Sequence, residues 1–320
     1  MRWTKLVCAW ALVLAVPYAA AQQQLSIATG GTGGVYYPYG GGLAELINKY
    51  IDGYAAVAEV TGASVENMGL IARRDSDLAL ALADTVYQAY SGTGRFEGRR
   101  IEKVRALASI YPNAVQIVTL KGSGITSLQD LKGKRVSVGA PGSGTEVNAQ
   151  ALLEANGLTY DDIDEQRLNF NETADALRDG DIDAGFWSVG PPTSSILNLA
   201  VTREIAIVPI SAEEIANARK VEPVFARYIL RAGTYDKVDV DVPTISIPNV
   251  LAVNADMPDD LAYAITKVLF EKTDELIAIH PAARDTTVDF SLESTPVPLH
   301  PGAIRYYEEI GRTVPDHLKP

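Results

Sequence analysis

The chain has 320 residues, enough for about two domains of ordinary size. Hydrophobic residues make up 47% of it and charged residues 21%, a balance that excludes a largely disordered protein. The net charge of −12 argues against a nucleic-acid partner and against adsorption to an anionic membrane, because both require basic patches. A small anion held by local dipoles is compatible with this charge.

The first segment of the chain has the pattern of a secretory signal peptide. Arg2 and Lys5 form a basic start, an apolar stretch covers residues 6–16, and Ala21 ends a small-residue cleavage site. The apolar stretch is shorter than the roughly 20 residues that a membrane-spanning helix needs. Cleavage after Ala21 would also remove Cys8, the one cysteine. We therefore expect an exported protein without disulfides or a thiol nucleophile, as is typical of a bacterial periplasm.

Strands and helices alternate along the next two thirds of the chain, which predicts βαβ units and mostly parallel sheets. Strands are expected at residues 25–29, 55–61, 77–82, 104–110, 114–120, 135–139, 184–189 and 205–210. Helices are expected at residues 43–50, 64–72, 85–90, 127–131, 146–156, 173–178 and 194–200. In the second strand, Val57 and Val60 are expected to point inward. The last third contains a long extended stretch at 242–253, a long helix at 261–279 and a short helix at 304–310.

A glycine-rich loop is predicted at residues 30–42, between a strand and a helix. It contains the sequence Gly30-Gly31-Thr32-Gly33-Gly34. Glycine there would permit positive φ angles, so that consecutive backbone N–H groups could converge on an anion. Tyr36 stands where a dinucleotide-binding fingerprint has its third glycine, and no Gly-Lys-Ser/Thr of an NTPase phosphate loop follows. The loop predicts either an anion site at a helix N-terminus or a tight structural turn.

A second loop of the same kind, Gly142-Ser143-Gly144-Thr145, occurs in the other half of the chain. Ser143 or Thr145 would by default cap the helix that follows. Two such loops, facing each other across a cleft, could hold the two ends of a small diacid. Tyr36 and Tyr37 would add aromatic walls and phenol donors.

Catalytic chemistry has little support in the sequence. His280, His300 and His317 all lie near the end of the chain, and no Gly-x-Ser-x-Gly elbow supplies a nucleophile. The acidic run at residues 161–164 lacks the rest of a calcium-binding loop. We therefore expect no enzyme activity, no catalytic residues, no bound metal and no cofactor.

Several sequence blocks, in order, share the motifs of one protein family. They are Thr29-Gly30-Gly31-Thr32-Gly33-Gly34-Val35-Tyr36-Tyr37-Pro38, Ser64-Val65-Glu66-Asn67, Asp130-Leu131-Lys132-Gly133-Lys134-Arg135-Val136 with Gly139-Ala140-Pro141-Gly142-Ser143-Gly144-Thr145, Asp175-Ala176-Leu177 with Gly190 and Pro192-Thr193, and Leu299-His300-Pro301-Gly302-Ala303. Together they resemble the TAXI class of solute-binding proteins, which serve TRAP transporters. One block is unspecific, but five in order are specific, and the resemblance covers residues 25–312.

This resemblance implies an α/β fold of the type II periplasmic binding class, a two-lobed clamshell with a two-stranded hinge. Lobe one would comprise residues 22–112 and 250–320, and lobe two residues 113–249, after a signal peptide of residues 1–21. The chain would cross the hinge near residues 110–118 and again near residues 244–253.

The resemblance also implies a periplasmic receptor, expected to be monomeric, that passes a small carboxylate to a sodium-driven TRAP permease. The ligands that we associate with the family are acidic, such as glutamate or the C5 dicarboxylate 2-oxoglutarate. A ligand-sensing partner of a membrane sensor kinase would use the same clamshell and is an open alternative. A hydrolase that depends on one of the histidines is a third hypothesis.

The ligand-binding residues expected from the loops and the resemblance are Gly31, Thr32, Gly33, Tyr36, Tyr37, Ser64, Asn67, Asp84, Gly142, Ser143, Gly144, Thr145, Trp187 and Gly190. Two departures from the family's pattern concern the ligand. Arg74 stands where glycine is usual, and Leu82-Ala83 replaces a pair that is usually polar. Asp84, which follows that pair, would either bind an ammonium group of the ligand or cap the helix at 85–90.

Overall fold

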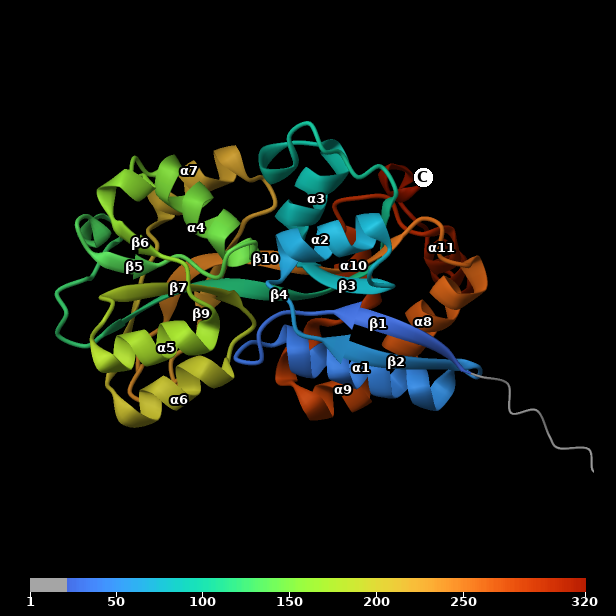
Figure 1. Ribbon diagram of the computed structural model, residues 1–320, viewed down its shortest axis with the longest axis horizontal. Coiled ribbons are helices and arrows are strands. Elements are labelled where there is room, and N and C mark those ends of the chain that lie inside the picture. Colours follow the sequence, from blue (N-terminus) through green and yellow to red (C-terminus); the bar gives the residue numbers. More distant parts are fainter. Residues whose placement is uncertain (1–21) are drawn as a thin grey trace, which may run out of the picture.

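The computed structural model describes residues 22–320, and the predicted signal peptide lies outside the described residues (Figure 1). Ten strands form one sheet, in the order β2-β1-β3-β10-β4-β7-β5-β6, with β8 paired to β4 and β9 to β10. Figure 1 shows two groups of elements with β4 running between them. We call the group with β1–β3 and α1–α3 the first lobe, and the group with β5–β7 and α4–α7 the second lobe.

The strands are β1 (Gln23–Ala28), β2 (Tyr54–Glu59), β3 (Leu78–Leu82), β4 (Val104–Leu120), β5 (Arg135–Ser137), β6 (Asp164–Gln166), β7 (Ala184–Val189), β8 (Ile205–Val208), β9 (Ala226–Leu230) and β10 (Val242–Asn254). The α-helices are α1 (Tyr36–Tyr50), α2 (Ser64–Arg73), α3 (Ala83–Ser91), α4 (Gly144–Ala155), α5 (Phe170–Asp179), α6 (Ser194–Thr202), α7 (Ala212–Val221), α8 (Asp259–Glu271), α9 (Thr273–Ile279), α10 (Val288–Ser294) and α11 (Pro301–Glu309). None of the helices within 22–320 is long and apolar enough to cross a membrane.

Parallel pairing holds inside each lobe, as predicted. β1 pairs in parallel with β2 and β3, and β5 pairs in parallel with β6 and β7. β4 and β10 are the two longest strands and run antiparallel to their neighbours. β10 pairs with β3 of the first lobe, β4 pairs with β7 of the second lobe, and the two long strands pair with each other. The two lobes are therefore joined by a two-stranded connection. The α/β, two-lobed fold with a two-stranded hinge is confirmed, whereas the residues at which one lobe ends and the other begins stay a prediction.

The hinge strands meet at a pair of prolines. β4 is one continuous strand through Pro112, where two shorter strands were predicted. Pro112 lies opposite Pro248 of β10, and the pairing register shifts directly after that position. Proline has no backbone N–H, so neither residue of this pair can donate to the hydrogen-bond ladder between the two strands.

The first glycine-rich loop is shorter than predicted, because α1 begins at Tyr36 rather than at residue 43. Gly40 and Gly42 are therefore helical. A Cβ on Gly40 would collide with the Thr29 side chain, and one on Gly42 would collide with Ile279. These glycines allow close packing of the helix, which the sequence pattern alone could not distinguish from a loop.

Two further predictions about the elements are wrong. Val57 and Val60 are 53% and 58% exposed, and Ala56 faces the core of this edge strand instead. The long helix predicted at 261–279 is two helices, α8 and α9, which meet at Lys272. The elements β6, β9, α7 and α10 were not predicted.

Candidate functional site

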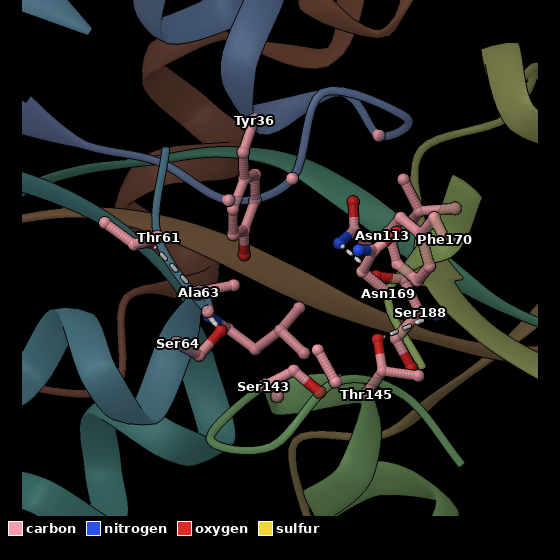
Figure 2. Close-up of a pocket in the computed structure, with 18 of the residues that line it drawn as sticks. Tyr36, Thr61, Ala63, Ser64, Asn113, Ser143, Thr145, Asn169, Phe170 and Ser188 are labelled. Atoms are coloured by element: carbon pink, nitrogen blue, oxygen red, sulfur yellow. Dashed lines mark hydrogen bonds between the residues drawn. The ribbon is translucent and has the colours of Figure 1, made fainter. Parts of the chain in front are cut away.

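A cavity lies between the two lobes, with an empty volume of about 560 Å³ that includes the part open to solvent. The lining residues are Gly30, Gly31, Gly34, Val35, Tyr36, Thr61, Gly62, Ala63, Ser64, Leu82, Asn113, Ala140, Ser143, Gly144, Thr145, Asn169, Phe170, Ser188 and Val189. Figure 2 shows side chains from both lobes directed into this space.

Four helices begin at the cavity wall. The residues at the starts of α1, α2, α4 and α5 line it: Tyr36, Ser64, Gly144 and Phe170. The first backbone N–H groups of a helix have no partner inside the helix, and each N-terminus carries about half a positive elementary charge. Of the residues between 22 and 320, none that lines the cavity has a charged side chain. Among the lining residues, the source of positive potential for a ligand is therefore the backbone dipoles.

The N-terminus of α4 is capped and leaves donors free. Ser143 is the N-cap residue, and its Oγ accepts a hydrogen bond of 3.1 Å from the backbone N–H of Glu146. The capping role predicted for Ser143 is confirmed. The N–H groups of Gly144 and Thr145 precede the first hydrogen bonds of the helix, so they can bind a ligand.

The N-terminus of α2 is occupied by the opposite lobe. The carbonyl of Gly142, in the loop before α4, accepts hydrogen bonds from the N–H groups of Val65 and Glu66 at 3.1 and 3.2 Å. Ser64 is turned inward, and its Oγ accepts a hydrogen bond of 3.1 Å from the N–H of Leu82. The second glycine-rich loop thus contacts the first lobe as well as lining the cavity.

A buried chain of amide side chains connects the cavity to both hinge strands. The Tyr36 hydroxyl donates to Oδ1 of Asn249 in β10 at 2.6 Å. Nδ2 of Asn249 donates to Oδ1 of Asn113 in β4 at 2.8 Å, and Nδ2 of Asn113 donates to the carbonyl of Ser188 at 2.8 Å. Burial raises the pKa of Tyr36, so its phenol stays neutral and keeps its proton.

Asp84 does not line the cavity, although it lies at the contact between the lobes. It is the second residue of α3, and the N-cap is Leu82, so the capping role predicted for Asp84 is wrong. Its Oδ2 accepts a hydrogen bond from Nδ2 of Asn148 in α4, and its Oδ1 accepts one of 2.7 Å from the N–H of Thr85. Burial, with a smaller contribution from the nearby Glu222 carboxylate, raises the pKa of Asp84 to about 7.

Six of the fourteen predicted ligand-binding residues line the cavity: Gly31, Tyr36, Ser64, Ser143, Gly144 and Thr145. Thr32 and Gly33 instead lie at a contact between the lobes outside it. Nδ2 of Asn171 donates to Oγ1 of Thr32 at 3.2 Å, and the Gly33 carbonyl accepts from the N–H of Ser195 at 3.3 Å.

The remaining predicted residues lie around the site or away from it. Tyr37 is 38% exposed, and Gly142 lies on the loop that contacts α2. Asn67 is buried and donates to the main-chain carbonyls of Leu80 in β3 and of Thr29, directly after β1. Trp187 is buried and donates to Oγ of Ser195 at 3.1 Å, and Gly190 packs against Tyr111. The structure therefore brings the starts of four helices together at the cavity, whereas these predicted residues do not line it.

Several lining residues were missed by the sequence analysis, among them Asn113, Asn169, Phe170 and Ser188. Asn169 could have been found, because it forms a capping box with Glu172 at the start of α5. Ser188 could also have been found, since it lies near the carboxyl end of a predicted strand, where ligands of open α/β sheets bind. Asn113 carries no local signal, because its role depends on pairing with distant parts of the chain.

Metal and histidine chemistry are not evident at the site. Within the described chain, no three His, Cys, Asp or Glu residues come close enough together to hold a metal ion. His280 contacts the carbonyl of Pro192 at 3.2 Å, and His300 is buried elsewhere as the N-cap of α11. Neither histidine lines the cavity that residues 22–320 form.

The two-lobed α/β fold is shared with solved structures of proteins from import systems. A putative L-cystine ABC transporter protein from Listeria monocytogenes has a TM-score of 0.52 at 14% identity, over 85% of this chain and 99% of its own. The ligand-binding component of an ABC-type import system from Staphylococcus aureus also has a TM-score of 0.52, at 12% identity over 93% and 97%. At such identities the likeness concerns the fold alone. The sequence profile of the NMT1-like family matches residues 27–311, and the chain belongs to that family.

Proposed function

We propose that the protein is a periplasmic receptor that binds a small dicarboxylate between its lobes and delivers it to a TRAP permease. The observation that carries the ligand class is the convergence of four helix N-termini on a cavity without charged side chains. Each N-terminus carries about half a positive charge, and those of α1, α4 and α5, which are not bonded to the Gly142 carbonyl, favour an anionic ligand. Between the lobes these dipoles act at short range and with little solvent screening.

The same cavity favours 2-oxoglutarate over glutamate. An amino acid would bring an ammonium group, which needs a carboxylate partner when it is buried. The only carboxylate that we expected for this role, Asp84, is bound to Asn148 and Thr85 and does not line the cavity. Leu82 and Phe170 provide apolar walls that suit the methylene carbons of a C5 acid.

Delivery to a TRAP permease is supported by the ordered sequence blocks that resemble the TAXI class. The solved structures that share the fold include parts of ABC import systems, so the fold itself is used with more than one kind of transporter. The N-terminal segment with the pattern of a signal peptide supports a periplasmic location.

A thermal-shift panel on ligand-stripped protein tests the ligand class. We expect 2-oxoglutarate at about 100 times its Kd to stabilise the protein by about 2.7 kcal/mol, a shift of roughly 5–10 °C. Glutamate should give a smaller shift, and neutral sugars should give none. A shift with a sugar and none with any dicarboxylate would overturn the proposal. Loss of sodium-dependent uptake of the ligand on deletion of the gene would then support the transport step, whereas intact uptake would contradict it.

A further inference from the structure

Ser188 has a buried hydroxyl that makes no hydrogen bond in the described part of the chain. It lies in β7, is 5% exposed and lines the cavity. Its Oγ has no hydrogen-bond partner among residues 22–320. Other hydroxyls of the wall do have partners, since Ser143 caps α4 and Ser64 accepts a hydrogen bond from Leu82. A buried hydroxyl without a partner is unfavourable, so a partner that arrives with the ligand would stabilise the closed site.

The backbone of Ser188 is held from two sides. Its N–H donates to Oγ1 of Thr145 at 3.3 Å, and its carbonyl accepts from Nδ2 of Asn113 at 2.8 Å. These contacts place Ser188 next to the N-terminus of α4, as Figure 2 shows. A ligand carboxylate on the N–H groups of Gly144 and Thr145 would therefore have its neighbouring carbon beside Ser188.

We propose that the Ser188 hydroxyl donates a hydrogen bond to the 2-oxo oxygen of the ligand, so that the site selects 2-oxo acids over acids with a plain methylene at that carbon. This inference rests on the proposed function and names the feature of the ligand that one side chain recognises. In a 2-oxo acid the oxo oxygen lies on the carbon next to the carboxylate. Ser188 lies next to Thr145, whose N–H group would bind that carboxylate, so the Ser188 hydroxyl would lie beside the oxo oxygen. An acceptor suits this position better than an ammonium group, because no carboxylate of the described chain lines the cavity.

Isothermal titration with 2-oxoglutarate and glutarate tests the inference, since the two acids differ in the oxo group alone. We expect the unmodified protein to prefer 2-oxoglutarate by about tenfold, the ratio that corresponds to about 1.4 kcal/mol. In Ser188→Ala the affinity for 2-oxoglutarate should fall about tenfold and that for glutarate less than threefold, which removes the preference. An unchanged ratio in Ser188→Ala would overturn the inference and leave the proposed function standing.

Ser76 offers a matched control. Its Oγ is likewise without a partner in the described part of the chain, and it is 3% exposed, but it lies at a different cavity, beside Arg74 and Asp77. Ser76→Ala should leave the ratio of the two affinities unchanged. A loss of preference in Ser76→Ala equal to that in Ser188→Ala would overturn the inference.

Two further outcomes separate recognition from structure. Without ligand, Ser188→Ala should unfold at the same or a higher temperature, because it removes a hydroxyl that has no partner. A lower unfolding temperature together with an equal loss of both affinities would make Ser188 structural and overturn the inference. If Ser188→Ala does not fold, Ser188→Cys keeps the shape of the side chain with a much weaker donor and should lose most of the preference, and a full preference there would contradict us. If neither acid binds the unmodified protein, the proposed function fails and the inference fails with it.

Discussion

The two glycine-rich loops are alike in sequence but use glycine for different physical reasons. In the loop before α1, no glycine of residues 30–34 has a positive φ, so the left-handed backbone that these glycines would permit is not adopted. Gly33 and Gly34 are needed for space instead. A Cβ on Gly33 would collide with the side chain of Asn171, and one on Gly34 would come within 3.0 Å of the Phe170 ring, both on the opposite lobe.

The loop before α4 needs glycine for its backbone as well as for space. Gly139 and Gly142 have φ angles of +100° and +75°, which residues with a Cβ rarely adopt. Gly144 has no such angle, but a Cβ there would lie 2.5 Å from Cδ1 of Leu82 and 2.7 Å from Oγ of Ser64. A glycine-rich strand-to-helix loop therefore does not by itself predict an anion nest, because its glycines can also allow two lobes to touch.

The largest expected effect is on closure at the second loop. Gly144→Val would push against Leu82 and Ser64 of the first lobe, so the closed state should become rare. We expect the ligand affinity to fall about 100-fold, since the apparent affinity scales with the fraction of closed protein. Titration calorimetry measures this, with Gly41→Val as the control, because a Cβ on helical Gly41 meets nothing within 4 Å. Equal affinities of the two variants would show that closure does not depend on this contact.

The pH dependence of the free energy of unfolding tests the buried contact between Asp84 and Asn148. Asn148 lies in α4, the helix that follows the second loop. The pKa of Asp84 is raised to about 7 in the folded protein, by burial first and then by Glu222. Between about pH 4 and 7 the folded state therefore binds a proton that the unfolded state has lost, so stability should fall as the pH rises through this range. The slope from this group is at most about 1.4 kcal/mol per pH unit.

Thermal unfolding between pH 4 and 8 measures that slope. Asp84→Asn should flatten the profile, because it removes the titrating group. Asp75→Asn is the control, since Asp75 is exposed and paired with Arg73 on the surface. A profile that stays unchanged in Asp84→Asn would contradict the assignment.

A smaller effect should separate the backbone role of glycine from its role in packing. Gly142→Ala should destabilise the ligand-free protein by about 1–2 kcal/mol, because alanine disfavours the left-handed region. Space is not at issue, since the nearest atom to a Cβ there is 3.9 Å away. Gly31→Ala is the counterpart in the first loop, without a positive φ and with its nearest neighbour at 4.0 Å, and it should change stability by less than about 0.5 kcal/mol. Equal melting temperatures of the two variants would contradict the different roles of glycine in the two loops.

The smallest effect is expected at Thr32. Its hydroxyl accepts a hydrogen bond of 3.2 Å from Asn171, and this contact is exposed to solvent. Thr32→Ala should weaken ligand binding by less than about threefold, because an exposed hydrogen bond exchanges with water at little net cost. A loss of ligand affinity as large as that expected for Gly144→Val would instead indicate that Thr32 contacts the ligand, as the sequence analysis predicts.

Much of the fold could be predicted from local pattern. The strand at residues 184–189 coincides with β7, because a buried parallel strand is a short apolar run between turn signals. The start of α1 was missed because the helical use of Gly40 depends on Thr29, with which it packs in the folded chain. The inward face of β2 was predicted wrongly because Val57 belongs to an edge strand, where one face is open.

The candidate site was predictable to the extent that it consists of helix N-termini. Ser143 and Ser64 stand at strand-to-helix junctions, and local sequence indicates such positions. Asn113 and Phe170 line the cavity only because the lobes bring them there. The position of Asp84 outside the cavity could not be predicted either, because its partner Asn148 belongs to the other lobe.

The proline pair of the hinge gives the molecule a defined elastic joint. Where Pro112 faces Pro248, neither residue can donate a backbone hydrogen bond, and side chains add further links between the strands. Nδ2 of Asn249 donates to the carbonyl of Tyr111 and to Oδ1 of Asn113, both at 2.8 Å. An amide on a rotatable side chain can follow a bend that would break a strand-to-strand ladder, so the joint bends at low cost and keeps its alignment. We therefore expect bending of the sheet to be concentrated at this level, beside the cavity that Asn113 lines.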